Sequence, residues 1–442
     1  MTDYDVAVIG AGVTGVATAR RLALDGRSVV LIEKGGDILS GASKANSALL
    51  HTGFDAPEGS LELACMQAGH RAFLGLAQAM NLPVLKTGAM VLAWTEAQEA
   101  ALPAILAQAH RNGVTDTRLM TAAEIHAAEP HLAPARAGVW VPGEYVIDPW
   151  SPFHGYAAQI LDAGGTILRR TEVTGGDFDG AWDLQTSNGP IRANHVINCA
   201  GLYGDRVEAA LLGHQDFTIR PRKGQFVVFD KAASQYLNAI ILPVPDARTK
   251  GVVLTRTIFG NLLVGPTAEE TDDRHRATTT RPELDALITR AVEILPALRD
   301  MAVTATYAGL RPATEFKEYR IRHEPRRNWV TVGGIRSTGL TASLGIAQHV
   351  AGLLGATGAE PPGPAMPNLA EHLPRDHQTP GWGEIVCNCE MVTRREIEAA
   401  FASPLPPGDL GGLKRRTRAM MGRCQGFNCQ GRITELTKGR FA

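Results

Sequence analysis

The sequence predicts a mixed α/β fold, in which a domain of parallel strands and helices is interrupted by a mainly antiparallel domain and followed by a small C-terminal unit. Buried apolar strands alternate with helices near the N-terminus, and short alternating strands dominate the middle of the chain. Four of the six cysteines gather near the C-terminus. At 442 residues, the chain is long enough for two or three domains.

The N-terminal unit begins with a β-branched apolar run at 4–9, which is typical of a buried strand. The pattern Gly10-x-Gly12-x-x-Gly15 follows and opens a helix, and Glu33 ends the second strand. The first glycine permits a tight turn, the second lets amides approach a pyrophosphate, and the third lets helix and strand pack closely. Glu33 can accept ribose hydroxyls. These features predict a Rossmann-like dinucleotide-binding unit; the alternative is a glycine-rich turn in an ordinary α/β sheet.

The rest of the body mixes both kinds of structure. Alanine-rich helical segments cover 96–135, and short strands and turns follow from 137 to 270. A helix is expected at 281–299, a strand at 328–334 and a last helix at 341–355. We therefore expect a nucleotide-binding domain made of 1–90, 151–220 and 326–356, and an antiparallel substrate domain made of 91–150 and 221–325.

A proline-rich break at 357–382 is expected to be an extended linker before the C-terminal unit, 383–442. That unit carries two close pairs of cysteines, which are Cys387 with Cys389 and Cys424 with Cys429. Two such pairs can bring together the four thiolates that a [2Fe–2S] cluster or a zinc ion requires. The C-x-C spacing favours the cluster, because zinc ribbons mostly use C-x₂₋₄-C. Structural zinc is the alternative.

Two other groups of side chains have structural interpretations. Cys65 and Cys199 lie in apolar or glycine-rich contexts and are expected to be buried thiols, not nucleophiles. Basic residues before the third cysteine either offset the charge of an anionic cluster or form a solvated helix face. These residues are Lys414, Arg415, Arg416, Arg418 and Arg423.

The bulk composition excludes several classes of function. The net charge is -1, with 44 basic and 45 acidic side chains, so the protein has no excess positive charge to attract nucleic acid or an anionic membrane. No apolar run approaches the ~20 residues of a membrane-spanning helix. The N-terminus lacks the basic region and cleavage site of a signal peptide. We therefore expect a cytoplasmic protein without a nucleic-acid partner, which would reach the inner membrane only peripherally, through another protein.

Four segments resemble the family of FAD-dependent amine and hydroxy-acid oxidoreductases typified by D-amino-acid oxidase (DAO). They are VAVIGAGVTG at the start, SGASKANSALLHTGFDAPEGSLEL at 40–63, VINCAGLYGD at 196–205 and GGIRSTGLTASLGIA at 333–347. The resemblance covers about residues 1–355 and implies that the dinucleotide is FAD. Within the family, the 40–63 segment and PVPDARTKGV…VGPT at 243–267 resemble L-2-hydroxyglutarate dehydrogenases.

The C-terminal unit resembles the [2Fe–2S] domain named after bacterioferritin-associated ferredoxin. Its run LKRRTRAMMGRCQGFNC is similar to the tail of anaerobic glycerol-3-phosphate dehydrogenases. The two resemblances therefore imply the same cofactors, FAD and a [2Fe–2S] cluster, and point to two different substrates.

The resemblance also implies which residues hold FAD. The glycine loop and the second strand would bind the adenosine end of FAD. A segment near residue 40 would bind the pyrophosphate, and the start of a helix near residue 340 would bind the flavin ring. A helix N-terminus there would stabilise negative charge on reduced flavin. The alternative at each position is packing or turn formation. The implied residues are Gly10, Gly12, Thr14, Gly15, Glu33, Lys34, Ser40, Ala42, Ser43, Val173, Ala200, Gly201, Gly334, Gly339, Leu340 and Thr341.

His51 is the candidate catalytic base, because a neutral imidazole can remove a hydroxyl proton near pH 7. Its alternatives are positioning the flavin or attaching it covalently. Arg311 and Arg256 are candidate clamps for a substrate anion, since a guanidinium offers two parallel hydrogen bonds. The alternative for each is a surface arginine. Relatives also contact substrate or flavin at positions that match Lys223 and Gln225.

Together these features predict an FAD-dependent dehydrogenase that oxidises a small anionic hydroxy compound. The [2Fe–2S] cluster would pass the electrons to a quinone or a protein subunit. The preferred substrate is L-2-hydroxyglutarate or a similar 2-hydroxy acid, and the first alternative is glycerol 3-phosphate. A further alternative is an electron-transfer subunit of a heteromeric amino-acid dehydrogenase.

Overall fold

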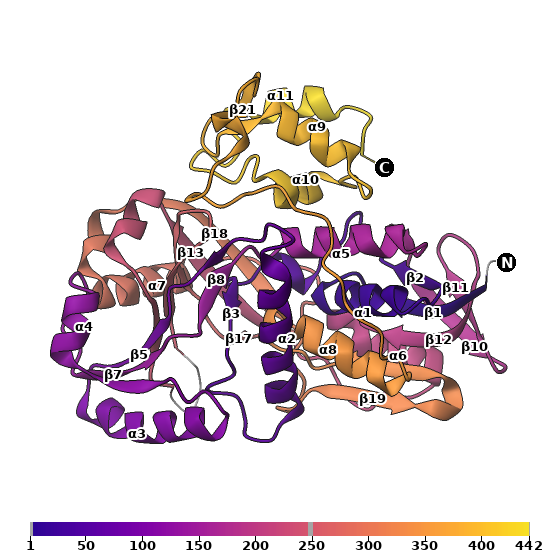
Figure 1. The fold of residues 1–442 in the computed structure, drawn as a ribbon, viewed down its shortest axis with the longest axis horizontal. Coiled ribbons are helices and arrows are strands. Elements are labelled where there is room, and N and C mark those ends of the chain that lie inside the picture. Colours follow the sequence, from indigo (N-terminus) through magenta and orange to yellow (C-terminus); the bar gives the residue numbers. More distant parts are fainter. Residues whose placement is uncertain (1–2, 246–250, 442) are drawn as a thin grey trace.

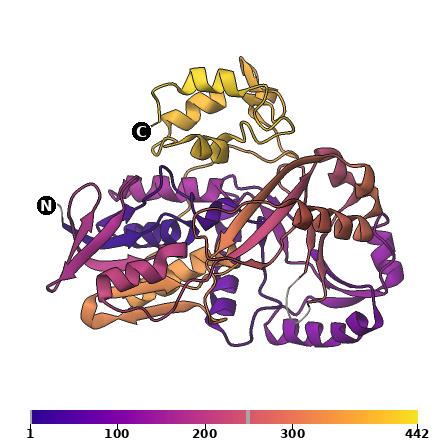
Figure 2. The ribbon, with the colours of Figure 1, turned by 180° about the vertical axis from the view of Figure 1, so that it is seen from behind.

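The computed structural model describes residues 3–245 and 251–441. Residues 246–250, which belong to the segment that resembles L-2-hydroxyglutarate dehydrogenases, lie outside the described residues. The chain forms two large lobes, and a small C-terminal domain lies across them (Figure 1). The same arrangement is seen from behind in Figure 2.

The first lobe is built on an eight-stranded sheet with a parallel centre. The order β9-β2-β1-β12-β20 is parallel throughout, and β10, β11 and β19 extend the sheet with antiparallel pairs. β19 lies within the 221–325 span, but its hydrogen bonds go to β20 of this sheet. The strands are β1 (Asp3–Ile9), β2 (Val29–Ile32), β9 (Thr166–Leu168), β10 (Val173–Phe178), β11 (Trp182–Thr186), β12 (Ile191–Asn198), β19 (Arg320–Glu324) and β20 (Trp329–Gly333).

Helices bury one face of this sheet in tight packing. A Cβ atom on Gly69 would lie 2.0 Å from the Thr341 carbonyl oxygen, and one on Gly345 would lie 2.1 Å from that of Cys65. These glycines therefore let α2 and α8 meet at backbone contact. The helices on this face are α1 (Val13–Leu24), α2 (Leu61–Ala77), α5 (Ser151–Asp162) and α8 (Gly339–Leu353), while α6 (Gly204–Leu212) contacts β10 and β20.

The second lobe is a nine-stranded, almost wholly antiparallel sheet, in which only the β14–β5 pair is parallel. Its helices are α3 (Glu96–Arg111), α4 (Ala122–Ala128) and α7 (Arg281–Ile294). The helix expected at 281–299 ends at Ile294, because Pro296 disfavours helical backbone before it. The strands are β5 (Ala89–Ala93), β6 (Arg118–Thr121), β7 (Ala137–Val141), β13 (Arg222–Phe229), β14 (Ile240–Pro243), β15 (Val253–Arg256), β16 (Leu262–Gly265), β17 (Glu269–Glu270) and β18 (Val303–Arg311).

A small three-stranded sheet joins segments that are distant in sequence. It pairs β3 (Leu49–Leu50) and β4 (Val84–Leu85) with β8 (Tyr145–Ile147) in antiparallel register. The chain segments that flank β3 and β8 carry the polar residues described below.

The C-terminal domain contains a two-stranded ribbon and three helices. Its elements are β21 (Ile385–Cys387), β22 (Val392–Thr393), α9 (Arg394–Ala402), α10 (Leu410–Thr417) and α11 (Gln430–Thr437). We refer to residues 383–441 as the cluster domain. None of the helices within the described ranges has the length and apolarity needed to cross a bilayer.

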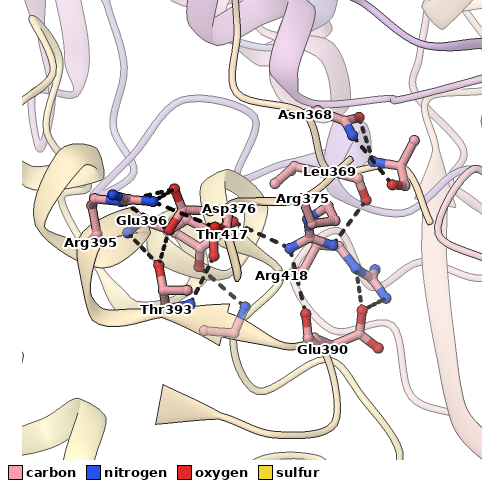
Figure 3. Close-up of polar contacts among 12 residues, drawn as sticks. Asn368, Leu369, Arg375, Asp376, Glu390, Thr393, Arg395, Glu396, Thr417 and Arg418 are labelled. Atoms are coloured by element: carbon pink, nitrogen blue, oxygen red, sulfur yellow. Dashed lines mark hydrogen bonds and ion pairs between the residues drawn. The ribbon is translucent and has the colours of Figure 1, made fainter. Parts of the chain in front are cut away.

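The segment 357–382, which we call the strap, is extended apart from a short turn at Asp376–Gln378. It packs along the body, with Leu369 and Ala370 buried and the Glu371 amide donating to the Ile258 carbonyl oxygen. Figure 3 shows how its end is fastened to the cluster domain. Arg375 donates to the carboxylate of Glu396 at 3.3 Å and to the carbonyl oxygen of Glu390 at 3.5 Å, and Asp376 pairs with Arg395. The strap is thus a packed connection.

Candidate active site and cysteine centre

The glycine loop lies between β1 and α1 in the geometry that the sequence predicts. Gly10 has a φ of 100°, and a Cβ atom on it would lie 2.6 Å from the Cys199 carbonyl oxygen. A Cβ atom on Gly15 would lie 1.8 Å from the Gly10 carbonyl oxygen. Gly12 caps the N-terminus of α1, where a Cβ atom would lie 3.1 Å from Ser43 Oγ. The loop therefore requires glycine at positions 10 and 15, leaves little room for a side chain at position 12, and presents a helix N-terminus suited to phosphate.

Side chains from the second strand and from residues 40–43 gather around this loop. The Glu33 carboxylate accepts hydrogen bonds from the amides of Ala11 at 2.8 Å and Gly35 at 2.7 Å. The hydroxyl of Ser43 accepts one from the Val13 amide at 3.0 Å. Ala42 lies in the short turn before it. These residues thus occupy the edge of the sheet where β1 and β2 end.

Further residues implied in dinucleotide binding reach the same edge. The Thr171 amide donates to the Glu33 carbonyl oxygen at 2.9 Å, which places the start of β10 at Val173 close by. Ala200 follows β12, and its Cα atom lies 3.0 Å from a Cβ atom built on Gly10. The Lys34 ammonium lies 3.1 Å from the centre of the Tyr203 ring, and burial lowers the pKa of this lysine.

The start of α8 is the second helix N-terminus near the loop. Gly339, Leu340 and Thr341 form its first turn, and a Cβ atom on Gly339 would lie 3.7 Å from Val13 Cγ2 at the start of α1. The hydroxyl of Thr341 accepts a hydrogen bond from the His51 amide at 3.0 Å. The candidate base is therefore tied directly to this helix.

His51 belongs to a pair that the sequence did not reveal. Its Nδ1 lies 2.7 Å from Oε2 of Glu144, whose side chain is 1% exposed. The other oxygen, Oε1, accepts hydrogen bonds from the amide of Thr52 at 2.6 Å and from its hydroxyl at 2.8 Å. Glu144 therefore fixes the imidazole so that Nδ1 carries the proton and Nε2 is the basic nitrogen. A carboxylate directly before β8 was the only sequence signal for this residue.

Arg311 ends β18, where it is partly buried. Its hydrogen bonds within 3–245 and 251–441 go to the carbonyl oxygens of Lys223 and Thr267 at 3.3–3.4 Å, and no carboxylate there acts on its pKa. Burial lowers the pKa of Arg311 to about 10, so it stays charged at neutral pH. A Cβ atom on Gly224 would lie 2.3 Å from Arg311 Nη2. The glycine thus makes room for the guanidinium of Arg311.

The register of β13 and β18 shows which side chains share the face of Arg311. Directly opposite residues lie on the same face, and Arg311 is opposite Arg222. Two residues earlier, Gly309 packs against Ala45, where a Cβ atom would lie 2.8 Å from the Ala45 Cβ. Tyr307 donates to the Asn46 carbonyl oxygen at 2.7 Å. This face therefore lies against the segment that leads to His51, and Arg222 adds a second cation to it.

Three other candidates do not join this group. Lys223 and Gln225 alternate with Arg222 and so lie on the opposite face, where Gln225 bonds to Thr280 before α7. Arg256 pairs with Leu262, at the other end of the sheet from Arg311. The charge of Arg256 acts on the pKa values of Glu129 and His372. Both Arg256 and Arg311 are arginines in strands, so the sequence alone did not show that they lie far apart in the sheet.

The four C-terminal cysteines form one connected set of thiols. Side-chain hydrogen bonds join Cys389 to Cys424 and Cys387 to Cys429, and charge on Cys387 or Cys424 acts across the pairs. Cys387 and Cys429 are buried, whereas Cys389 and Cys424 are partly exposed. Among the described residues, no three or more His, Cys, Asp or Glu side chains are already gathered around a single metal position. The donor set is that of a thiolate-bound cluster.

The basic residues before the third cysteine are mostly not solvated. Arg415 and Arg418 are buried, and Arg416 has a side chain that is 7% exposed. Arg418 pairs with Glu390 at 3.2 Å and lies 4.0 Å from the centre of the Phe259 ring in the second lobe. These arginines therefore dock the cluster domain on the body, which neither sequence interpretation had considered.

The two remaining cysteines are buried within the body as expected. Burial raises the pKa of Cys65 to about 12 and that of Cys199 to about 12. Such thiols stay neutral and unreactive at physiological pH.

Comparisons with known proteins give one match for the body of the chain and another for the cluster domain. Residues 5–353 match the family described as FAD dependent oxidoreductase (DAO), and residues 385–438 match the BFD-like [2Fe-2S] binding domain. The chain is 31% identical to a glycerol 3-phosphate dehydrogenase of Caloramator mitchellensis, over 98% of this chain and 93% of the relative. It is 29% identical to an L-2-hydroxyglutarate dehydrogenase of Indibacter alkaliphilus, over 60% of this chain and 68% of the relative.

A solved structure supports the fold of the body. The dithionite-reduced L-alpha-glycerophosphate oxidase of Mycoplasma pneumoniae, with FAD bound, superposes with a TM-score of 0.74. It is 27% identical, and the match covers 83% of this chain and 97% of that chain. The fit of the glycine loop, the match over 5–353 and this superposition agree on one cofactor and one class of chemistry. The chain therefore belongs to the DAO family of FAD dependent oxidoreductases and carries a BFD-like [2Fe–2S] binding domain.

Proposed function

We propose that this protein is a dehydrogenase for glycerol 3-phosphate. The observation that carries the proposal is the partly buried cation Arg311, which lies on the sheet face that packs against the segment leading to His51. A relative named glycerol 3-phosphate dehydrogenase supports it, because the likeness extends over both the FAD and the cluster domains.

The residues of this chain have distinct parts in the reaction. Arg311, with Arg222 beside it, holds the phosphate of the substrate through charge-assisted hydrogen bonds. His51 Nε2 accepts the proton of the reacting hydroxyl, and Glu144 stabilises the imidazolium that forms. When bound, FAD would supply the two-electron acceptor for the hydride on the carbon that carries this hydroxyl, and the [2Fe–2S] cluster would supply a one-electron outlet.

The arrangement of cations favours a phosphate over a dicarboxylate. Arg311 and Arg222 are cross-strand neighbours, so they form one concentrated positive spot, although Arg222 also pairs with Glu270 at 2.5 Å. A single dianionic group fits one such spot. L-2-hydroxyglutarate carries its two carboxylates at opposite ends and needs two separated clamps. It is the second candidate, favoured by the relative of Indibacter alkaliphilus.

FAD is proposed to bind along the edge described above. Its adenosine diphosphate end would meet the glycine loop, Glu33 with Lys34, Ser40–Ser43, Val173 and the Ala200-Gly201 turn. The flavin ring would meet Gly334 and the first turn of α8. Both helix N-termini offer partial positive charge to the groups placed there.

A single-turnover experiment tests the substrate. Anaerobic protein is mixed with glycerol 3-phosphate or L-2-hydroxyglutarate, and bleaching of the flavin absorbance is followed by stopped flow. Faster bleaching with glycerol 3-phosphate supports the proposal, and bleaching only with the hydroxy acid replaces it with the second candidate. Bleaching with neither compound refutes both.

The cluster ligands are proposed to be Cys387, Cys389, Cys424 and Cys429. Iron and acid-labile sulfide assays should give two of each per chain, as the cluster formula requires. Replacing Cys389 by Ser should lower both contents, whereas Cys65→Ala should leave them unchanged because Cys65 lies in the body. One tetrahedral zinc per chain would refute this assignment.

The electron acceptor is proposed to be a quinone or a protein subunit. Partial exposure of Cys389 and Cys424 supports an outlet on their side of the cluster domain. Cys389→Ser should abolish reduction of a soluble quinone while bleaching by substrate persists. A second polypeptide that copurifies and is needed for any bleaching would favour the heteromeric dehydrogenase instead.

A further inference from the structure

The cluster domain docks on the loop at 33–43, between the residues proposed to hold FAD. Glu33 lies at one end of this loop, and Ser40–Ser43 lie at the other. Asp37 in its middle is 0% exposed. The Asp37 carboxylate pairs chiefly with the cluster domain, whereas Glu33 and Ser40–Ser43 are proposed to contact FAD.

Asp37 is held mainly by groups from α10 and the turn before it. Arg416 Nη1 lies 2.6 Å from Oδ2, and Nη2 lies 3.1 Å from Oδ1. The Gly408 amide donates to Oδ2 at 3.2 Å. In the body itself, Arg169 lies 3.8 Å from Oδ1, and the Ile38 amide donates at 2.8 Å. The shortest charged contact of this buried carboxylate therefore crosses the domain boundary.

The boundary is shaped for this contact. A Cβ atom on Gly412 would lie 1.6 Å from Asp37 Oδ2, and one on Gly408 would lie 1.9 Å from the Gly36 carbonyl oxygen. Arg415 donates to the Ile38 carbonyl oxygen at 3.0 Å. The loop and α10 thus meet at backbone distance, and side chains larger than glycine would separate them.

The position of Asp37 is linked to the glycine loop by short bonds. The hydroxyl of Ser40 donates to the Asp37 carbonyl oxygen. The Leu39 amide donates to the Ala11 carbonyl oxygen at 2.8 Å, between Gly10 and Gly12. A shift of Asp37 would therefore move both sides of the proposed pyrophosphate site.

We propose that Asp37 and Arg416 are positioning residues for FAD. By docking on Asp37, the cluster domain holds the pyrophosphate loop in place and cancels a carboxylate charge close to the phosphates. FAD affinity and docking of the cluster domain are then linked, and each strengthens the other by the same factor. The proposal rests on the proposed role of Ser40–Ser43 in FAD binding.

The first test measures FAD affinity without substrate. Apoprotein with its cluster intact is titrated with FAD, and binding is read from quenching of FAD fluorescence. Arg416→Gln should raise the Kd roughly 5- to 150-fold, the usual range of coupling between sites. Asp37→Asn in the same chain should recover much of the affinity, since it removes a buried carboxylate charge whose remaining cation, Arg169, lies 3.8 Å away.

Arg432→Gln is the matched control. It also removes an arginine of the cluster domain, but its partner Glu384 lies in the same domain and both side chains are 39% exposed. Its Kd should stay within about twofold of the wild type, because exposed ion pairs contribute little. An Arg416→Gln chain with the Kd of this control would overturn the proposal.

The second test uses the wild-type chain and needs no variant to fold. Hydrogen exchange of the α10 amides is compared with and without FAD, while the strap contacts in Figure 3 keep the domain tethered. Slower exchange with FAD is expected, and equal exchange refutes the linkage. Ser43→Ala separates the premises, since an unchanged Kd would reject the pyrophosphate role itself. Failure to oxidise glycerol 3-phosphate would leave all of these measurements intact.

Discussion

Replacing Glu144 with Gln should disable the base without unfolding the site. The substitution keeps the shape of a side chain that is 1% exposed and changes only the hydrogen bonds that the side chain can accept or donate. In the native pair, Oε2 accepts from His51 Nδ1 at 2.7 Å, while Oε1 accepts from the amide and hydroxyl of Thr52. A glutamine has one acceptor oxygen, and the two donors of Thr52 will claim it.

The amide nitrogen of the new glutamine must then face His51. Because that nitrogen is a donor, Nδ1 has to become the acceptor, and the proton moves to Nε2. The nitrogen that should take the substrate's proton is thereby blocked. General-base catalysis contributes about 10²–10⁴-fold, so the rate of flavin reduction should fall by about that factor. Substrate affinity should change little if Arg311 holds the anion as we propose.

The assay is anaerobic stopped-flow reduction of the flavin at several glycerol 3-phosphate concentrations and pH values. The limiting rate should fall by this factor, and raising the pH should not restore it, since the block comes from the tautomer that the glutamine imposes. Thr52→Val is the control. It removes the hydroxyl donor at 2.8 Å but leaves the His51–Glu144 contact, so its rate should fall by less than about tenfold. A Glu144→Gln rate within tenfold of the wild type, with the same pH profile, would refute this assignment.

Three further outcomes are expected. Arg311→Met should raise the KM for glycerol 3-phosphate about 10²-fold or more, because the phosphate loses its charged partner. Arg256→Met should leave the KM unchanged, because Arg256 lies at the other end of the sheet. Equal effects of the two substitutions would contradict this placement. Gly15→Ala should abolish FAD binding because its Cβ atom would lie 1.8 Å from a carbonyl oxygen. Gly75→Ala in α2, where a Cβ atom would meet nothing within 4 Å, should bind FAD normally, and a fluorescence titration compares the two. Burial raises the pKa of Cys199 to about 12, so iodoacetamide at about pH 8.5 should leave it unlabelled in native protein, and labelling seen by mass spectrometry would contradict its burial.

The features that the sequence predicts correctly are those set by constraints between residues close together in the chain. Gly10 and Gly15 were recognisable because each meets a constraint set within a few residues or by the end of the adjoining strand. The apolar pattern predicts a helix up to residue 299, but α7 ends at Ile294 because Pro296 disfavours helical backbone at the residue before it. Family and cofactors followed from such segments, and the matches over 5–353 and 385–438 confirm them.

The pairing of distant side chains was decided by the tertiary structure alone. Glu144 reaches His51 across 93 positions because β3 and β8 pair in one register, and Asp37 meets Arg416 across 379 positions because two domains dock. By itself, the sequence determined the glycine loop and the two close pairs of cysteines, and it named Arg311 only as a candidate. Which face a strand residue occupies depends on register and packing between segments far apart, so only the fold could separate Arg256 from the site and supply the histidine with its carboxylate.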